Sequence, residues 1–146
     1  MRIVLGSDHA GFALKEHVKQ TLQAGGHQVT DVGADSAESV DYPGFARAAA
    51  TLVAGGEAQF AVLACGSGVG VSIVANKVPG VRAVNAHDAE EAAMARRHND
   101  TNVVTLSGAR LDGAQADHIV AAFLATGFEG GRHARRVEQI GEGECA

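Results

Sequence analysis

The residues whose types and spacing could do chemistry lie in one short stretch, Cys65-Gly66-Ser67-Gly68-Val69-Gly70. Three glycines at alternate positions let the backbone turn tightly and let a ligand approach the main chain. The apolar run 60–64 before this turn reads as a buried strand, and the apolar residues of 71–75 read as the start of a helix. A strand, a glycine-rich turn and a helix start together point backbone N–H groups at an anion. A thiol at such a helix start is favoured in its reactive thiolate form.

The loop does not match the common nucleotide-binding or hydrolase motifs. The dinucleotide fingerprint GxGxxG needs a glycine where this chain has Val71, and the GK[ST] ending of a P-loop is absent. A cysteine phosphatase loop would carry an arginine six residues after Cys65, where Val71 stands again, and the GxSxG elbow of a serine hydrolase is absent. The plainer interpretation is a cysteine that packs beside a tight turn. Glycines this dense are seldom needed for packing alone, so we favour a binding site.

Composition bounds the class of protein. The chain has 146 residues, enough for one domain with a sizeable core, and 46% of them are hydrophobic while only 4% are aromatic. A net charge of −5 argues against general nucleic-acid binding and against attachment to an anionic membrane surface. The two cysteines, Cys65 and Cys145, do not make a disulfide framework.

The sequence predicts neither an export signal nor a membrane span. The first residues, MRIVLGSDHAG, turn polar too soon for a signal peptide. Residues 58–76 carry no charge, but glycines and serines interrupt them, which disfavours a transmembrane helix. We therefore expect a soluble cytoplasmic protein with no nucleic-acid partner and no membrane partner.

Strand and helix patterns alternate along the chain. Apolar runs predict strands, and apolar residues at helical spacing, closed by Gly25-Gly26 and Gly55-Gly56, predict helices. Asp88 with Glu91 is a capping signal for one helix, and Asp112 opens another. The expected strands are 2–7, 28–32, 60–64, 82–86 and 103–106, and a last helix near 137–140 follows the basic run 130–136. This alternation predicts a single α/β domain over 1–146, with a parallel sheet covered by helices on both faces and a C-terminal basic helix or tail at about 130–146.

Chemistry-bearing residues follow three of the expected strands. The first, third and fifth strands lead into Asp8-His9, into the loop 65–70 and into 108–110, which ends in Arg110. Ligands of parallel α/β sheets bind outside the carboxyl ends of the strands. We therefore expect a carboxylate, an imidazole, a thiol, an amide-rich loop and a guanidinium at one edge. Asp8-His9 also has a plainer interpretation, as a helix N-cap and its neighbour.

Further candidates lie elsewhere in the chain. Arg132 and Arg136 would share a helix face and could clamp one phosphate, although a solvated basic face is the plainer interpretation. His98 closes a helix, where the helix dipole favours a cation whatever its function. The other histidines lack the spacing of a metal site, and no HxxxH, CxxC or HExxH pattern occurs. We expect no metal site.

The chain also resembles a known enzyme family. GSDHAGFALK near the N-terminus is similar to the signature of the ribose-5-phosphate isomerase B family, which includes the galactose-6-phosphate isomerase subunits. Further matches, in the same order, are DYP at 41–43, CGSGVGVSIVANK at 65–77, RHNDTNV at 97–103, SGAR at 107–110 and EGGRHARRV at 129–137. The resemblance implies a Rossmann-like three-layer α/β/α fold with a five-stranded parallel sheet. It also implies a homodimer, with a tetramer as the alternative, and aldose–ketose isomerisation of a small phosphorylated sugar without metal or cofactor.

The resemblance assigns roles by matching motif. Cys65 would be the base that moves a proton between C1 and C2, with Ser67 beside the enediolate. His98 would open the furanose ring with Asn99 beside it, and in the family both come from the partner subunit. Some relatives have a glutamate at the position of Val71, so this chain resembles the cysteine subtype. The residues implied in substrate binding, among them an anion hole of loop amides and a phosphate site of His9 and arginines, are Asp8, His9, Tyr42, Gly66, Gly68, Val69, Gly70, Ser72, Asn99, Arg110, Arg132 and Arg136.

The chemistry agrees with this assignment independently. Enolisation needs a base near the operating pH and a preorganised site for oxyanion charge, and a helix-terminal thiolate with a run of amides would supply both. The expected substrates are ribose 5-phosphate and ribulose 5-phosphate. Allose or galactose 6-phosphate and erythrulose 4-phosphate are alternatives, as are a catalytically silent phosphosugar-binding subunit and a nucleotide-binding module. The presence of both Cys65 and His98 speaks against the silent subunit.

Overall fold

Strands and helices alternate through the chain, as the pattern predicts. The computed structural model describes residues 1–144, so Cys145 lies outside the described residues. The elements in order are β1 Arg2–Ser7, α1 Phe12–Ala24, β2 Gln28–Asp31, α2 Tyr42–Ala54, β3 Phe60–Cys65, α3 Val69–Asn76, β4 Ala83–Asn85, α4 Ala89–Asn99, β5 Val103–Ser107, α5 Gly113–Ala125 and α6 Arg132–Gly141. None of the helices within residues 1–144 combines the length and the apolar character that a membrane span requires.

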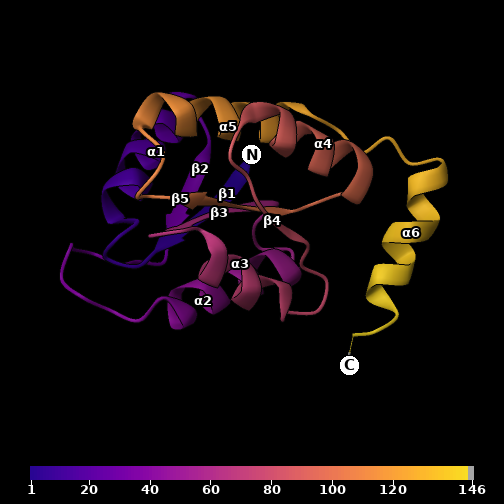
Figure 1. Cartoon of the computed structure of the whole chain (residues 1–146), viewed down its shortest axis with the longest axis horizontal. Helices are drawn as coiled ribbons and strands as arrows, with labels where there is room; N and C mark the ends of the chain where they lie inside the picture. Colours follow the sequence, from indigo (N-terminus) through magenta and orange to yellow (C-terminus); the bar gives the residue numbers. More distant parts are fainter. Residues whose placement is uncertain (145–146) are drawn as a thin grey trace.

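The five strands form one parallel sheet in the order β2-β1-β3-β5-β4. Helices α1, α4 and α5 cover one face of this sheet, and α2 and α3 cover the other (Figure 1). The chain places β2 on one side of β1 and β3 on the other, and α/β sheets bind ligands at such a reversal. The expected three-layer α/β/α architecture with a five-stranded parallel sheet is confirmed.

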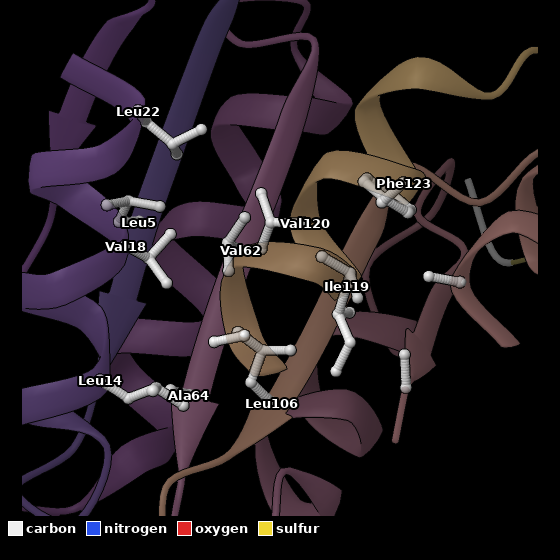
Figure 2. Close-up of a cluster of buried hydrophobic side chains, with 14 of the residues drawn as sticks. Leu5, Leu14, Val18, Leu22, Val62, Ala64, Leu106, Ile119, Val120 and Phe123 are labelled. Carbon is white, nitrogen blue, oxygen red and sulfur yellow. The ribbon is translucent and has the colours of Figure 1, made fainter. Parts of the chain in front are cut away.

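Apolar side chains fill the space on both sides of the sheet, because strands buried on both faces need two apolar layers. The layer beneath α1 and α5 includes Leu5, Leu14, Val18, Val62, Leu106, Ile119 and Phe123 (Figure 2). The opposite layer has smaller side chains, with Ala46 and Ala49 of α2 fully buried near Leu63 of β3. Cys65 is the last residue of β3 that faces this second layer, so the strand itself aims the thiol toward α2 and α3.

Several element boundaries differ from the expected ones, and β3 and β5 each extend one residue further than expected, to Cys65 and Ser107. β2 ends at Asp31, one residue earlier than expected, although the Val32 N–H still donates to the Leu5 carbonyl of β1 at 2.9 Å. β4 covers only Ala83–Asn85, and just before it the Arg82 N–H donates to the Asn102 side chain at 2.8 Å. α6 begins at Arg132, so the basic run lies within the last helix and does not precede it.

A buried cation joins α1 to the end of β2. The Lys15 side chain is almost fully buried, and its Nζ donates to Asp31 Oδ2 at 2.6 Å and to Glu16 at 3.0 Å. Lys19 also donates to Asp31, at 2.8 Å. Burial alone would raise the pKa of Asp31, but the hydrogen bonds from Lys15 and Lys19 outweigh it and lower this pKa below 3.8. The charged carboxylate therefore stabilises the folded state.

We expect this carboxylate to give the protein an acid-sensitive stability. A depressed folded pKa contributes stability that is complete above about pH 4 and is lost as the pH falls through the folded pKa. Asp31→Asn should lower the free energy of unfolding by about 1–2 kcal/mol at pH 7, because the carboxylate is partly solvated. Urea unfolding of wild type and variant at pH 7, 4 and 3 would measure this, with the exposed Asp35→Asn as the control. If the difference in unfolding free energy between wild type and Asp31→Asn is the same at all three pH values, the assignment is contradicted.

Candidate active site

The carboxyl ends of β1 and β3 meet at a cleft of about 450 Å³. β1 leads directly into Asp8, and β3 ends at Cys65, as the register of the two strands requires. The end of β5 lies beside β3, where Cys65 pairs with Ser107. The cleft is lined by Asp8, Ala10, Tyr42, Cys65, Gly66, Ser67, Val69, Gly70 and Ile73. The predicted meeting of the carboxylate, the thiol and the glycine-rich loop at one edge is confirmed.

The glycine-rich loop folds back on the thiol. Cys65 is 4% exposed, and its Sγ accepts the N–H of Gly68 at 3.2 Å. Gly68 begins α3 with φ 77°, and a side chain at Gly68 would also run into Asn85. Gly70 has no room for a side chain, because a Cβ there would lie 2.6 Å from the ring of Tyr42. The loop can therefore place a sulfur, a hydroxyl and several amides around one small volume.

Three loop amides carry no partner. Within residues 1–144, the N–H groups of Ser67, Gly70 and Val71 donate no hydrogen bond to a carbonyl or a side chain. The first-turn amides of a helix have no intrahelical acceptor and attract negative charge. The Val69 N–H differs, since it donates to Ser67 Oγ at 3.1 Å. The Ser67 hydroxyl is then left with its own proton to donate into the cleft.

Three side chains that were not predicted as site residues donate hydrogen bonds to the carbonyl groups of this loop. Ser107 Oγ donates to the Gly66 carbonyl at 2.7 Å, and Thr105 Oγ1 donates to the Gly68 carbonyl at 2.7 Å. Asn85 Nδ2 donates to the intervening Ser67 carbonyl at 3.3 Å. A signal for two of them was present in the sequence, because Thr105 and Ser107 put hydroxyls at alternate positions of a strand expected to be buried.

The remaining residues at this edge have local partners. Asp8 is buried and lines the cleft, and its Oδ1 accepts the Gly11 N–H at 3.0 Å in the turn before α1. Gly11 is the N-cap of α1 and no side chain caps this helix, so the N-cap interpretation of Asp8 is wrong. His9 Nδ1 accepts the Val40 N–H at 3.1 Å, which ties the loop before α2 to the end of β1. Arg110 is exposed just beyond β5. Ser72, by contrast, is not among the residues that line the cleft.

His98 and Asn99 lie at the opposite edge of the sheet. α4 starts after the carboxyl end of β4 and returns along the sheet, so His98 at its end is near the amino ends of β4 and β5. Arg82, which immediately precedes β4, donates to the carbonyl of Asn99 at 3.1 Å and fixes this position. The five residues of β5 span about 13 Å at about 3.3 Å per residue. One chain therefore does not bring His98 to its own Cys65.

Arg132 and Arg136 lie with His98 and not with the cleft. They belong to α6, which stands apart from the sheet beside the end of α4 (Figure 1). Their spacing puts both guanidinium groups on one helix face, as expected. His133, between them in the sequence, is the one buried side chain of α6. Its ring stacks on that of His98, with centroids 4.3 Å apart and planes at 13°.

Glu129 completes this second cluster. Its Oε1 lies 3.8 Å from His98 Nε2 and 3.7 Å from His133 Nε2, close enough for the three groups to share a metal ion. An imidazole nitrogen binds a metal in the plane of its ring, however, and two near-parallel stacked rings cannot both hold one ion in plane. Burial, with the neighbouring charges of His98 and Arg132, lowers the pKa of His133 below 6.5. The arrangement is a stack that holds His98, with His133 neutral at pH 7.

Known proteins resemble this chain over nearly its full length. The profile of the family described as Ribose/Galactose Isomerase matches residues 3–140. Ribose-5-phosphate isomerase B of Escherichia coli (strain K12) is 46% identical over 140 residues, which are 95% of this chain and 93% of that protein. The crystal structure of a ribose 5-phosphate isomerase from Thermotoga maritima superposes with a TM-score of 0.95 at 44% identity, covering 97% of each chain. That of ribose-5-phosphate isomerase B from Mycoplasma genitalium with bound ribulose-5-phosphate gives 0.93 at 38% identity, covering 97% of this chain and 94% of that one. The chain therefore belongs to the ribose/galactose isomerase family and is an isomerase.

Proposed function

We propose that this protein interconverts ribose 5-phosphate and ribulose 5-phosphate through an enediolate, without metal or cofactor, with Cys65 as the base. The observation that carries the proposal is a buried sulfur in a cleft that is also lined by Ser67 and Gly70, whose N–H groups have no partner within residues 1–144. The names of the Escherichia coli and Mycoplasma genitalium relatives support the choice of a pentose phosphate. The crystal structure of the Mycoplasma genitalium protein holds ribulose-5-phosphate.

The proton transfer uses the two polar groups of the loop. The Cys65 thiolate takes the C2 proton of the open-chain aldose, and the C1 carbonyl electrons move to O1 to give the enediolate. The thiol then returns that proton to C1 while a proton passes from O2 to O1, which gives the ketose. Ser67 lies at the cleft with a free hydroxyl proton, which suits it to stabilise or relay charge between O1 and O2. The Gly68 N–H donates to the same sulfur and fixes its position at the cleft.

Loop amides stabilise the intermediate. The N–H groups of Ser67, Gly70 and Val71 are placed at the start of α3, where helix-terminal amides attract an oxyanion. A preorganised donor of this type contributes about 3 kcal/mol to transition-state stabilisation, because it needs no reorientation when the charge forms. The phosphate is held at the other end of the sugar by His9, Arg110, Arg132 and Arg136, and its binding aligns C1 and C2 with the thiolate.

The complete site is formed by two copies of the chain. His98 and Arg132 lie at the far edge from Cys65, so a second chain must supply them to this cleft. A ten-residue helix such as α6 is marginal alone, and its own chain buries only His133 of it. Val69 and Ile73 at the cleft are 49% and 56% exposed, which is a large apolar surface to leave in water. A homodimer that covers these surfaces would bring the partner's ring-opening His98, Asn99 and arginines to the cleft.

A panel of phosphosugars tests the proposal. We expect the highest kcat/KM for ribose 5-phosphate and ribulose 5-phosphate, and lower values for erythrulose 4-phosphate, allose 6-phosphate and galactose 6-phosphate. Purified protein treated with a chelator should keep its full rate, since no step uses a metal. A higher kcat/KM for a hexose phosphate would show that the hexose phosphate, and not ribose 5-phosphate, is the preferred substrate. Tight phosphosugar binding without conversion would indicate a silent binding subunit instead.

A further inference from the structure

We propose that Thr105, Ser107 and Asn85 are positioning residues that hold residues 66–69 of the catalytic loop in their active orientation, and that Ser107 also couples this loop to the phosphate-binding segment at Arg110. This inference rests on the proposed function of the loop. None of the three side chains lines the cleft, so each acts on the reaction through the backbone that it binds.

The loop needs an external constraint. Its three glycines allow each peptide plane two orientations at little cost, because glycine adopts positive and negative φ almost equally. One orientation aims N–H groups at the enediolate oxygens. The flipped orientation would aim a carbonyl oxygen at the same point and would repel the negative charge. The catalytic power of the loop therefore depends on what fixes its carbonyls.

Three donors fix three successive carbonyls on the side away from the cleft. Ser107 and Thr105 bind the Gly66 and Gly68 carbonyls at 2.7 Å each, and Asn85 binds that of Ser67 at 3.3 Å. The Ala109 N–H donates to the Gly66 carbonyl as well, at 3.1 Å. Because a peptide N–H points opposite to the carbonyl of the same plane, the three contacts orient three N–H groups. These are the Ser67 N–H of the anion hole, the Gly68 N–H that binds Cys65 Sγ and the Val69 N–H that binds Ser67 Oγ.

The burial of the two hydroxyls argues against a purely structural role. Thr105 is 0% and Ser107 is 2% exposed, on a central strand whose other residues are Val103, Val104 and Leu106. A buried hydroxyl costs free energy that a hydrogen bond only about restores, so an apolar side chain would serve the core equally well. Both hydroxyls bind the one segment of the chain whose carbonyl direction decides the chemistry.

Ser107 has a second contact that reaches the phosphate end. Its Oγ accepts the N–H of Arg110 at 3.2 Å while it donates to the Gly66 carbonyl. One hydroxyl thus sets the position of the anion-hole loop relative to the start of the Arg110 turn. A bound phosphosugar must satisfy both ends at once. Loss of the Ser107 hydroxyl should therefore weaken both catalysis and phosphate binding, whereas loss of the Thr105 hydroxyl should weaken catalysis alone.

The test compares hydroxyl deletions with conservative variants and with a matched buried control. Thr105→Val and Ser107→Ala should each lower kcat for ribose 5-phosphate by about 10²-fold, as does loss of an oxyanion-hole donor, while KM changes less than about 3-fold for Thr105→Val. Thr105→Ser and Ser107→Thr keep the hydroxyl and should recover most of the rate. Thr101→Val is the control, since Thr101 is also buried but its Oγ1 has no partner. It should leave kcat unchanged.

A second readout separates positioning from general damage. A hydroxamate phosphate that mimics the enediolate should bind Ser107→Ala about 10²-fold more weakly than wild type, while a sugar-alcohol phosphate, which lacks the anion, should lose far less affinity. An equal loss for both ligands, or an unchanged kcat, would overturn the proposal. If the wild type isomerises no phosphosugar, the proposed function fails separately. A crystal structure of Thr105→Val with the Gly68 carbonyl still turned to the sheet would then overturn the positioning role on its own.

Discussion

Cys65→Ala is expected to lower kcat by about 10²–10⁴-fold in both directions, the range associated with loss of a positioned general base. The variant removes one buried sulfur that makes a single hydrogen bond, to the Gly68 N–H. Folding should therefore survive, and phosphosugar affinity should stay within about 3-fold, because the phosphate groups and most loop amides are untouched. Steady-state rates from the aldose and from the ketose, with calorimetric binding of the same sugars, measure both expectations.

Two further variants make this result specific. Cys65→Ser keeps a hydrogen-bond acceptor for the Gly68 N–H but is a far weaker base at neutral pH, so it should be nearly as inactive as Cys65→Ala. Cys145→Ala changes the other cysteine of the sequence and should behave as wild type. Turnover near the wild-type rate in Cys65→Ala would remove the thiol from the mechanism. The anion-hole loop would then need another base, and Asp8, which lines the same cleft, is a candidate.

Local patterns carry most of the information about the fold. Apolar runs that end in glycine or aspartate predict the five strands because a strand buried on both faces tolerates few polar residues. The pairs Gly25-Gly26 and Gly55-Gly56 predict where α1 and α2 end, and both pairs do follow the last helical residue. The same rules fail by a residue or two where a side chain competes with the ladder, as Asn102 does when it accepts the Arg82 N–H before β4.

Half of the candidate site could also be predicted, namely the part that depends on strand ends. Parallel strands bring Asp8, Cys65 and the segment before Arg110 to one edge whatever the details of packing. The contacts that cross between elements could not be predicted. The stack of His98 on His133 depends on how α6 turns after Gly130 and Gly131, and the Thr105 and Ser107 contacts depend on the register of β5 with β3. Short-range sequence patterns do not encode such three-dimensional relations.

The placement of α6 also sharpens the prediction for a shared active site. Cys65→Ala and His98→Ala chains should each be inactive alone and should recover activity when they form a heterodimer. One of its two sites then combines Cys65 of one chain with His98 of the other. Random pairing of equal amounts gives heterodimers in half of the dimers, so the mixture should reach about one quarter of the wild-type rate in a twofold-symmetric dimer. Subunit exchange is first verified with two affinity tags.

Substitution of Arg132 on one chain or the other tests which chain supplies the phosphate clamp to that site. Arg132 is on α6, whose His133 stacks on His98 of the same chain, so the guanidinium should travel with His98. Adding Arg132→Ala to the Cys65→Ala chain should therefore reduce the recovered kcat/KM by about 30-fold, since a well-placed charge-assisted hydrogen bond contributes about 2 kcal/mol. Adding the same substitution to the His98→Ala chain should leave the recovered rate unchanged, because the working site takes its clamp from the other chain. Heterodimers that form but regain no activity would rule out a shared site. Recovery that is lost with Arg132→Ala on the His98→Ala chain would instead place Arg132 beside Cys65 of its own chain.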